Sequence, residues 1–405
     1  MILCMGIQVS NDANDKQSST VDWPMIGRIV LKAAILFVLL NVVFAALRPL
    51  ETLGNVSLYN VLFSGRARLP YGEVPAEDYN LTLNNVPAML AAHELNEPEP
   101  GGYNVLILGD SGTWGWFLEN EATLAGQLND LELHAAAGGQ VVAYNLGYPV
   151  MSLTKDVMLL DAALERIQPD LIIWLVTMQS FARDRQLEHP LLQQNAGRVR
   201  RLIADYNLAL DPDDPRLVVR EFLDETLIAR RRDLADLLRL QAWGLAWAAT
   251  GHDQAIPAEI PPRQSDLEAD ESWLDIAEPR TLSGVDLTFD VLAGGIARSG
   301  GATMTDMPGG TGAGGSGVPV LVVNEPIYIS DGANSDVRYN SFYPRWAYDQ
   351  YRTLLANVAG VEGWRYLDLW DAIPPEEFTD TPVHLTPAGM QQLAYIIARE
   401  LALTR

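Results

Sequence analysis

The longest apolar stretch of the chain lies near its N-terminus. From Ile26 to Leu47 the sequence reads IGRIVLKAAILFVLLNVVFAAL. Two basic residues, Arg28 and Lys32, precede the apolar part, which only Asn41 interrupts. A helix of this length extends about 33 Å, which is enough to cross a membrane. We therefore predict a transmembrane signal anchor over 26–47. A cleaved signal peptide, with small residues at Val43–Ala45, and a buried core helix are the alternatives.

The basic residues around this stretch favour one orientation. Lys16, Arg28 and Lys32 precede the apolar centre, whereas Arg48 alone closely follows it. The positive-inside rule then places residues 1–25 in the cytoplasm as an N-terminal tail and the rest of the chain outside the cytoplasm. We therefore expect a single-pass protein of the cell membrane whose larger part is extracytoplasmic.

A mixed segment over 48–100, rich in turn-forming residues, is predicted to be juxtamembrane, and short apolar runs begin after it. These runs are Tyr103–Leu108, Val141–Leu146, Leu171–Val176 and Pro319–Val323. Such runs are consistent with strands buried on both faces. Between the second and third runs lies one helical face, made of Val157, Leu160, Leu164 and Ile167.

A last helix is predicted near the C-terminus, with Thr386 as its N-cap and Pro387 at its first position. Its apolar face is Met390, Leu393, Ile397 and Leu401. Strands that alternate with helices predict an α/β fold with a parallel sheet and helices on both faces. Ligands bind beyond the carboxyl ends of the strands in such folds.

The region between the third and fourth runs is longer than a crossover needs. We assign residues 101–405 to one domain with an insertion at 181–317. Within the insertion, Arg198–Thr250 has a helical pattern, and Gly294–Gly317 is rich in glycine, which is typical of a flexible loop. The insertion is therefore interpreted as a helical cap or lid followed by a glycine-rich loop.

The composition excludes several classes of protein. The chain is 48% hydrophobic and 20% charged, close to globular averages, which excludes wholesale disorder. Its net charge of −24 argues against nucleic acid as a partner. The single cysteine, Cys4, excludes a disulfide framework and a cysteine-based zinc site, and no two of the five histidines are spaced as metal ligands. We therefore expect neither a metal nor another cofactor.

Two polar motifs stand at strand-to-helix edges. Gly109-Asp110-Ser111 follows the first apolar run, so Ser111 is expected at the carboxyl edge of the sheet and at a helix N-terminus. Free N–H groups there stabilise developing negative charge. A serine needs a base to attack an ester, and His384, just before the last helix, is the predicted base.

These blocks resemble those of the SGNH/GDSL hydrolase family, which is named for a serine, a glycine, an asparagine and a histidine in separate sequence blocks. The resemblance covers roughly Tyr103–Phe181 and Val318–Leu403. It implies a flavodoxin-like three-layer α/β/α sandwich, and ester hydrolysis or acyl transfer through an acyl-serine. The block GDSGTWGW makes Ser111 the nucleophile, and its own N–H would be one oxyanion donor.

The second and third blocks depart from the family pattern. In NLGYPVMS the place of the oxyanion glycine, five residues after Asn145, is taken by Val150, whose backbone N–H could serve; Gly147 is the nearby alternative. In the third block Gln179 stands at the place of the asparagine. It keeps the amide donor but is longer by one methylene.

The last block of the family usually reads Asp-x-x-His, whereas three residues separate Asp380 from His384 here. We expect the wider turn, which contains Pro382, still to bring Asp380 to the imidazole as the third member of a triad. The alternative is a Ser–His dyad in which a backbone carbonyl orients the histidine.

The stretch Asn324–Arg352 combines aromatic and basic residues after the fourth run. Its prominent members are Tyr328, Arg338, Tyr339, Tyr343 and Trp346. They are predicted to line a sugar-binding groove, and a packed loop and helix is the alternative.

Three functions follow from these observations. The first is an extracytoplasmic membrane-anchored esterase that acts on an ester-bearing substrate, such as O-acetyl groups on a surface glycan. The second is an O-acyltransferase that modifies a cell-surface polysaccharide through the same acyl-serine. The third is a catalytically inactive carbohydrate-binding relic, which the altered third block would favour.

Overall fold

The computed structural model describes residues 23–56, 58–62, 64–71, 85–136, 138–250, 260–301 and 317–403. The chain forms two compact units. One contains Met1–Arg48 with Glu221–Arg230, and the other contains Pro49–Arg220 with Arg231–Arg405. The expected cytoplasmic tail lies almost wholly outside the described residues.

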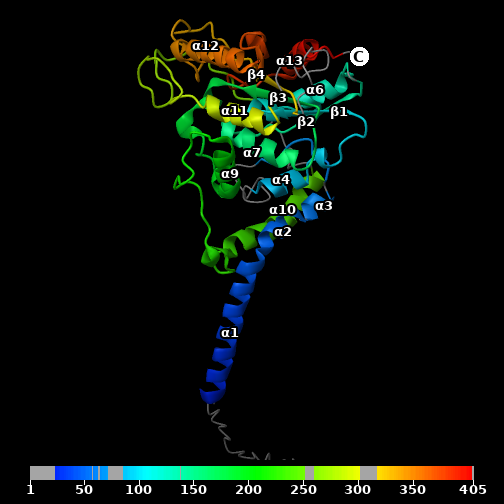
Figure 1. Cartoon of the computed structure of the whole chain (residues 1–405), viewed down its shortest axis with the longest axis vertical. Helices are drawn as coiled ribbons and strands as arrows, with labels where there is room; N and C mark the ends of the chain where they lie inside the picture. Colours follow the sequence, from blue (N-terminus) through cyan, green and yellow to red (C-terminus); the bar gives the residue numbers. More distant parts are fainter. Residues whose placement is uncertain are drawn as a thin grey trace, which may run out of the picture. The chain divides into compact units, whose positions relative to one another are not determined.

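The larger unit is built around a parallel sheet, whose strands are labelled in Figure 1 together with the helices. The strands of the described residues are β1 (Tyr103–Leu108), β2 (Val141–Asn145), β3 (Leu171–Val176), β4 (Val320–Asn324) and β5 (Arg365–Asp368). Their order is β2-β1-β3-β4-β5, and each neighbouring pair is parallel. This is the flavodoxin-like order, so the predicted three-layer α/β/α fold is confirmed. The four predicted strands correspond to β1–β4, whereas β5 was not predicted.

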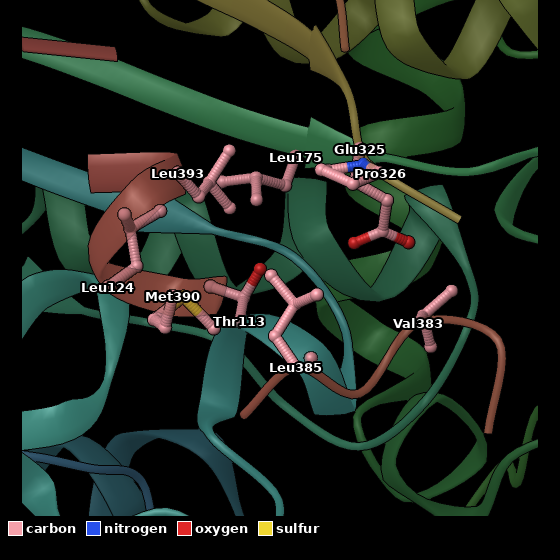
Figure 2. Close-up of a pocket in the computed structure, with 10 residues that line it drawn as sticks. Thr113, Leu124, Leu175, Glu325, Pro326, Val383, Leu385, Met390 and Leu393 are labelled. Atoms are coloured by element: carbon pink, nitrogen blue, oxygen red, sulfur yellow. The ribbon is translucent and has the colours of Figure 1, made fainter. Parts of the chain in front are cut away.

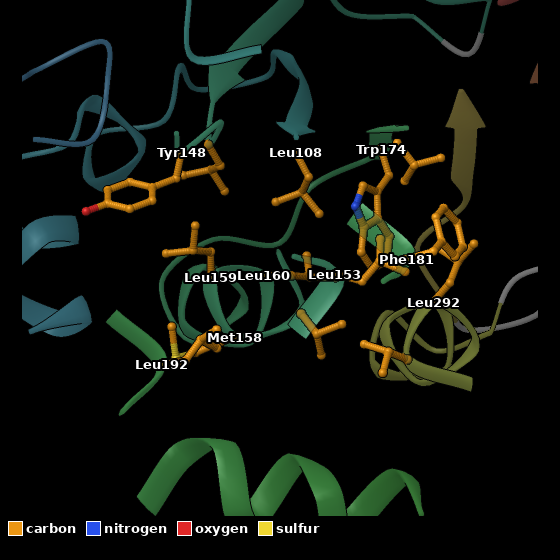
Figure 3. Packing of buried hydrophobic residues seen from close by; sticks show 14 of the residues in the cluster. Leu108, Tyr148, Leu153, Met158, Leu159, Leu160, Trp174, Phe181, Leu192 and Leu292 are labelled. Carbon is orange, nitrogen blue, oxygen red and sulfur yellow. The ribbon is translucent and has the colours of Figure 1, made fainter. Parts of the chain in front are cut away.

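Alternate strand residues serve two different cores, because successive side chains point to opposite faces of a sheet. Val105 of β1 and Ile173 of β3 pack with helices α6 (Leu124–Asp130) and α13 (Pro387–Glu400). The intervening side chains pack with α7 (Leu153–Leu164) and α11 (Phe289–Arg298). Figure 3 shows the second core, where Leu108 and Trp174 of the sheet lie over α7.

The other described helices complete both units. They are α1 (Trp23–Leu47), α2 (Pro49–Asn55), α3 (Leu58–Leu62), α4 (Val86–Ala91), α5 (Ser111–Trp114), α8 (Pro190–Gln194), α9 (Ala196–Tyr206), α10 (Arg231–Thr250) and α12 (Arg345–Glu362). Short 3₁₀ turns include η3 (Met178–Phe181) and η5 (Phe222–Glu225).

The last helix begins as predicted. The Thr386 side chain accepts the N–H of Gly389 at 3.1 Å, and Pro387 occupies the first helical position. Pro387 lacks an N–H and has a φ already close to the helical value, so it suits that position. The predicted apolar face is buried as far as Ile397, and the helix ends at Glu400.

The interpretation of the insertion as a cap is wrong for α9 and α11. Val199 of α9 and Leu292 of α11 belong to the same hydrophobic core as Trp174 of the sheet. Gly294 and Gly295, which were expected in a loop, lie within α11. A side chain at Gly295 would come within 2.4 Å of the Trp174 ring, so this glycine permits the close packing of α11 on β3. Residues 302–316 of the predicted glycine-rich loop lie outside the described residues.

The predicted juxtamembrane segment over 48–100 is also largely part of the larger unit. Leu69 and Leu90 are fully buried in its core. The Arg68 guanidinium donates to the backbone oxygens of Gly115 and Leu118, both at 3.1 Å. The domain boundary expected at residue 101 is therefore wrong, because these contacts join the segment to the loop after β1.

Helix α1 is long and apolar enough to cross a membrane. It begins at Trp23, somewhat before the predicted start. Along α1, which is described in full, Asn41 and Ala45 are the buried residues, and the large apolar side chains are exposed. A buried core helix is thereby excluded.

Candidate active site

Ser111 lies at the carboxyl end of β1, where the chain turns sharply into α5. The Asp110 carboxylate caps this turn by accepting the N–H of Gly112 at 2.8 Å. A side chain at Gly109 would come within 2.1 Å of Thr113 Oγ1, so the turn requires glycine at that place. The serine is thus presented at the edge of the sheet where ligands bind in this fold.

His384 connects Ser111 to Asp380 by a continuous chain of hydrogen bonds. The distance from His384 Nε2 to Ser111 Oγ is 2.8 Å, and the distance from His384 Nδ1 to Asp380 Oδ1 is also 2.8 Å. A carboxylate only accepts hydrogen bonds, so the imidazole proton is placed on Nδ1. Nε2 is then free to accept the serine proton, and the structure brings together the three residues predicted to form the triad.

The wider turn between Asp380 and His384 is closed by Thr379. The Thr379 N–H donates to the backbone oxygen of His384 at 2.9 Å, and its hydroxyl lies 3.2 Å from Asp380 Oδ1. Burial raises the pKa of the Asp380 carboxyl, but the hydrogen bond and charge interaction with His384 outweigh burial and hold this pKa below its usual range. Asp380 is therefore ionised at neutral pH.

Aromatic rings hold the imidazole in place. The Trp116 ring is stacked on His384 with centroids 6.1 Å apart, and Phe117 meets it edge-on at 6.2 Å. His384 is only 6% exposed. Phe117 has a φ of 62°, a left-handed conformation that is rare for an aromatic residue. The chain after Ser111 thus adopts a strained conformation at the residue that contacts the catalytic imidazole.

Gly147 does not fit the expected role of an oxyanion donor. Its N–H donates to the side-chain oxygen of Asn145 at 2.9 Å, so the amide is already occupied. A side chain at Gly147 would come within 2.4 Å of the backbone nitrogen of Trp114. The glycine is therefore explained by the close packing of the loop after β2 against α5.

The two other backbone donors differ from each other. In the described part of the chain, the N–H of Ser111 makes no hydrogen bond, as is common in the first turn of a helix. The N–H of Val150 donates to the backbone oxygen of Tyr148 at 2.6 Å across a three-residue turn. Ser111 can thus donate to an oxyanion without rearrangement, whereas Val150 must first leave Tyr148.

Gln179 lies in η3, directly beyond the carboxyl end of β3. Together with Val150 it borders a pocket of about 410 Å³. The other lining residues are Pro149, Met151, Arg185, Glu188, His189 and Pro190. The buried Tyr343 supports this turn, since its hydroxyl lies 2.8 Å from Thr177 Oγ1 and also hydrogen bonds to the backbone of Gln179.

A buried lysine joins the loop that carries Ser111 to the loop after β2. Lys155 of α7 is fully buried, and its Nζ donates to the backbone oxygens of Gly109 at 2.6 Å and Tyr148 at 3.1 Å. Its charge is paired with Asp156 at 2.6 Å, and the Trp174 indole N–H donates to the other Asp156 oxygen at 3.1 Å. One ion pair thus holds both loops to the same helix.

Two further carboxyl groups, Asp110 and Glu325, lie beside Gly112. Each residue is 4% exposed, and a side chain at Gly112 would come within 3.3 Å of Asp110 Oδ1 and 3.7 Å of Glu325 Oε2. Two adjacent buried carboxylates do not both stay ionised. Burial, followed by the charge and hydrogen bond of Asp110, raises the pKa of Glu325 well above its usual range. The Glu325 carboxyl therefore keeps its proton to a higher pH than an ordinary carboxyl does.

Figure 2 shows the Glu325 carboxyl beside a small internal cavity, with Thr113 and Val383 on its other walls. The volume of this cavity is about 10 Å³. Since that is about the space of one water molecule, the cavity is too small for a substrate. The pocket beside Gln179, at about 410 Å³, is large enough for a small molecule.

The predicted sugar-binding groove is not formed by the residues expected to line it. These residues are Tyr328, Arg338, Tyr339, Tyr343 and Trp346. The first four are at most 7% exposed. The Arg338 guanidinium is occupied by backbone oxygens of two loops, and the Trp346 indole N–H donates to the backbone oxygen of Glu271 at 2.7 Å. The reason is that α12 and the loop before it need these rings to cover the sheet.

Sequence reasoning missed Lys155, Glu325 and Thr379. Lys155 carried a weak signal, because a lysine stands inside an otherwise apolar helical pattern. Glu325 carried another, because an acidic residue directly follows a buried strand at the edge where ligands bind. Among the described residues, no cluster of histidine, cysteine and acidic side chains could hold a metal ion.

Scans against models of protein families and searches of curated proteins find no match. Solved structures with similarity include an inhibitor-bound aryl esterase of M. smegmatis, which is 12% identical with a TM-score of 0.35, over 74% of this chain and 99% of that one. A carbohydrate acetylesterase from Sinorhizobium meliloti is 12% identical with a TM-score of 0.33, over 74% and 98% of the two chains. A lipase/acylhydrolase from Enterococcus faecalis is 13% identical with a TM-score of 0.33, over 74% and 97%. Because these values are low, the fold assignment rests on the strand order and the parallel register.

Proposed function

We propose that this chain is a membrane-anchored serine hydrolase that cleaves an ester through an acyl-serine intermediate. The observation that carries the proposal is the hydrogen-bond chain from Asp380 through His384 to Ser111, in which both steps are 2.8 Å. This is the geometry required of a nucleophile, its base and the group that orients the base. Such an alignment has no use in a binding relic.

The reaction follows from the protons that these residues hold. Ser111 Oγ attacks the carbonyl carbon of the ester while His384 Nε2 takes the hydroxyl proton. Asp380 stabilises the imidazolium that forms. The C–O bond then breaks, His384 gives the proton to the departing alcohol, and the acyl group stays on Ser111. A water molecule, deprotonated by His384, attacks the acyl-serine and releases the acid.

The oxyanion that forms during each attack needs hydrogen-bond donors. The N–H of Ser111 is available without rearrangement. The side-chain amide of Gln179 is the proposed second donor, because it borders the substrate pocket at the end of the neighbouring strand. Val150 is a proposed third donor, which its present hydrogen bond to Tyr148 holds back until the turn opens.

The pocket beside Gln179 supports a hydroxyl-rich substrate such as an acylated carbohydrate. Its volume of about 410 Å³ lies within the range of small-molecule sites. Its wall carries the polar groups of Arg185 and Glu188. His189 Nδ1 accepts the N–H of Leu191, which leaves Nε2–H as a donor. Burial and the charge of Lys155 lower the pKa of His189 to about 4, so this donor is neutral at physiological pH.

The same polar pocket would also suit an acceptor sugar, so an O-acyltransferase that modifies a cell-surface polysaccharide is the alternative. The two activities share the acyl-serine and differ in whether water or a sugar hydroxyl removes the acyl group. Incubation with an acetyl ester, with and without glycan, followed by identification of the products, distinguishes free acetate from an acetylated glycan.

A serine-directed fluorophosphonate tests the proposal itself. We expect covalent labelling of the wild type and of Ser341→Ala, a matched variant at an exposed serine, and none of Ser111→Ala. Turnover of p-nitrophenyl acetate should follow the same pattern. Undiminished labelling and turnover in Ser111→Ala would contradict the proposed nucleophile.

We further propose that α1 anchors the protein in the membrane and that the catalytic unit is extracytoplasmic. A surface glycan would lie on the same side of the membrane. The support is the excess of Lys16, Arg28 and Lys32 before the apolar centre. A C-terminal reporter that is active only in the cytoplasm should remain silent. Its activity would reverse the orientation, and a mature chain that lacks α1 would indicate a cleaved signal peptide.

A further inference from the structure

Away from the catalytic site, the unit that contains α1 includes a segment that packs on this helix. The segment is Glu221–Arg230. The side-chain oxygen of Asn41 accepts the N–H of Ile228 at 3.0 Å, and the Asn41 amide donates to the backbone oxygen of Phe37 at 2.9 Å. Asn41, the polar residue that interrupts the apolar helix, therefore binds this segment by a hydrogen bond.

The segment presents large apolar side chains outwards. Phe222, Leu223 and Ile228 are 51%, 74% and 49% exposed, respectively. Asn41 lies six residues before the end of α1 at Leu47, which is about 9 Å along the helix axis. The segment that carries these exposed side chains therefore packs near the C-terminal end of α1, whose own surface is apolar.

The catalytic unit has an apolar surface on α2, α3 and α10. In the chain, α2 comes just after α1, and α10 comes just after the segment Glu221–Arg230. Helix α10 contacts both α2 and α3, and the Leu58 N–H donates to the Gln241 side chain at 2.7 Å. Large side chains on these helices, and on the turn after α2, are between 42% and 65% exposed: Leu53, Val56, Leu58, Val61, Leu62 and Leu238. Only Arg48 separates α1 from α2, and α10 begins at Arg231, directly after the segment.

We propose that these two surfaces, together called the membrane collar, lie in the interfacial layer of the bilayer that α1 spans. The collar consists of Glu221–Arg230 and of the apolar face of α2, α3 and α10. The proposal rests on α1 being the membrane anchor. Since Arg48 alone joins α1 to α2, covalent connection keeps the start of α2 within a few ångströms of the end of the span.

The chemistry of the collar identifies lipid as its occupant. An apolar face next to a span is buried about 5–10 Å into the headgroup and acyl boundary when it lies on a membrane. The net charge of −24 repels anionic lipid, so the collar binds by burial of apolar side chains rather than by charge. The catalytic unit is then held directly on the membrane surface, and its substrate must come within reach of that surface.

The test measures contact between lipid and single side chains of the full-length protein in nanodiscs. Cys4→Ser removes the one native cysteine, and single cysteines are introduced at Leu223, Val61 or Leu238 and labelled with an environment-sensitive dye. Quenching by spin-labelled phosphatidylcholine is compared with that at Val361, which is 85% exposed on α12. A cysteine at Leu36 reports whether α1 itself is in the bilayer.

We expect about threefold or more quenching at the collar positions relative to Val361, unaffected by high salt, in discs that hold one protein each. Fluorophosphonate labelling of every variant confirms that the catalytic unit is folded. If the dye at Leu36 is quenched while the dyes at Leu223, Val61 and Leu238 behave like the dye at Val361, the proposed collar is wrong. The proposal that α1 is the membrane anchor is then still supported. Absence of quenching at Leu36 overturns both. If the dye at the collar positions is shielded from solvent only in discs that hold two proteins, a second copy of the chain is the occupant. That result also overturns the proposal.

Discussion

The two sides of Ser111 are built in different ways. On the histidine side, Asp380 and His384 come from one short loop, and their hydrogen bonds to each other and to Ser111 are already complete. On the other side, the proposed oxyanion donors come from loops after different strands, and the amides of Gly147 and Val150 already have acceptors.

The two sides also differ in their charges. Asp380 is ionised and partly exposed, because the histidine stabilises its negative charge. The oxyanion side instead rests on buried groups, in which Lys155 neutralises Asp156 and Glu325 keeps its proton. Under the proposed mechanism, activation of the serine would depend on one local loop, whereas stabilisation of the oxyanion would depend on buried charges that hold separate loops together.

The largest effect is expected from the histidine side. Asp380→Asn should lower kcat up to about 10⁴-fold, because the imidazole loses its orientation and the stabilisation of its charged form. The pKa of Asp380 is held low, so the wild type should keep this contribution at mildly acidic pH and lose it as the pH falls through that pKa. Steady-state kinetics with p-nitrophenyl acetate measures both effects. Retention of more than half of kcat/KM, with an inactive His384→Ala, would establish a Ser–His dyad instead.

Gln179→Ala tests the oxyanion side directly. The expected loss in kcat is about 10²–10³-fold with a smaller change in KM, because an oxyanion donor acts mainly in the transition state. Gln179→Asn, which restores the family's shorter amide, is the matched variant and should recover part of the loss. A change of less than about threefold in Gln179→Ala would mean that backbone amides stabilise the oxyanion alone.

Lys155→Met tests whether buried charge positions the loops. We expect kcat to fall about 10²-fold, the scale of a displacement of about 1 Å at a reacting centre. Stability measured by urea unfolding should fall by about 3–5 kcal/mol, because Asp156 is left as an unpaired buried charge. The double variant Lys155→Met, Asp156→Asn should recover stability without recovering kcat. Equal recovery of both would show that Lys155 matters only for folding.

The smallest effect is expected at Glu325. Glu325→Gln should keep kcat/KM within about twofold, because an amide has nearly the shape of a carboxyl and, like the protonated carboxyl, places no second negative charge beside Asp110. Glu325 keeps its proton when folded and releases it when unfolded, so it destabilises the wild type as the pH rises above the usual carboxyl pKa, by up to about 1.4 kcal/mol per pH unit. The Tm advantage of the variant should therefore grow as the pH rises above the usual carboxyl pKa, until the pH reaches the raised pKa of Glu325. A pH-independent difference in Tm would mean that Glu325 is ionised in the folded protein.

Most of the fold could be predicted because strands buried on both faces leave uninterrupted apolar runs. Strand β5 could not, since RYLD at the edge of the sheet is only partly buried and has no such run. The helices of the insertion were assigned to a cap because the insertion is longer than a crossover needs, and Gly294 and Gly295 were assigned to a loop because they begin a glycine-rich stretch. These two glycines instead permit the close approach of α11 to Leu208 and Trp174, which no local pattern shows.

The sequence itself determined the pairing of Asp380 with His384 and the edge of the sheet at which Ser111 lies, whereas the contact between His384 and Ser111 joins distant segments. Asp380 and His384 are close in the chain, and the motif at Ser111 follows a strand whose carboxyl end meets the same edge of the sheet. Such short-range constraints depend on residues that are close to each other in the chain. The tertiary structure decided the occupied amide of Gly147, the burial of Tyr328, Tyr339 and Tyr343, and the proton on Glu325. Burial, hydrogen-bond saturation and pKa depend on groups from distant segments, so these properties arise only when the chain has packed.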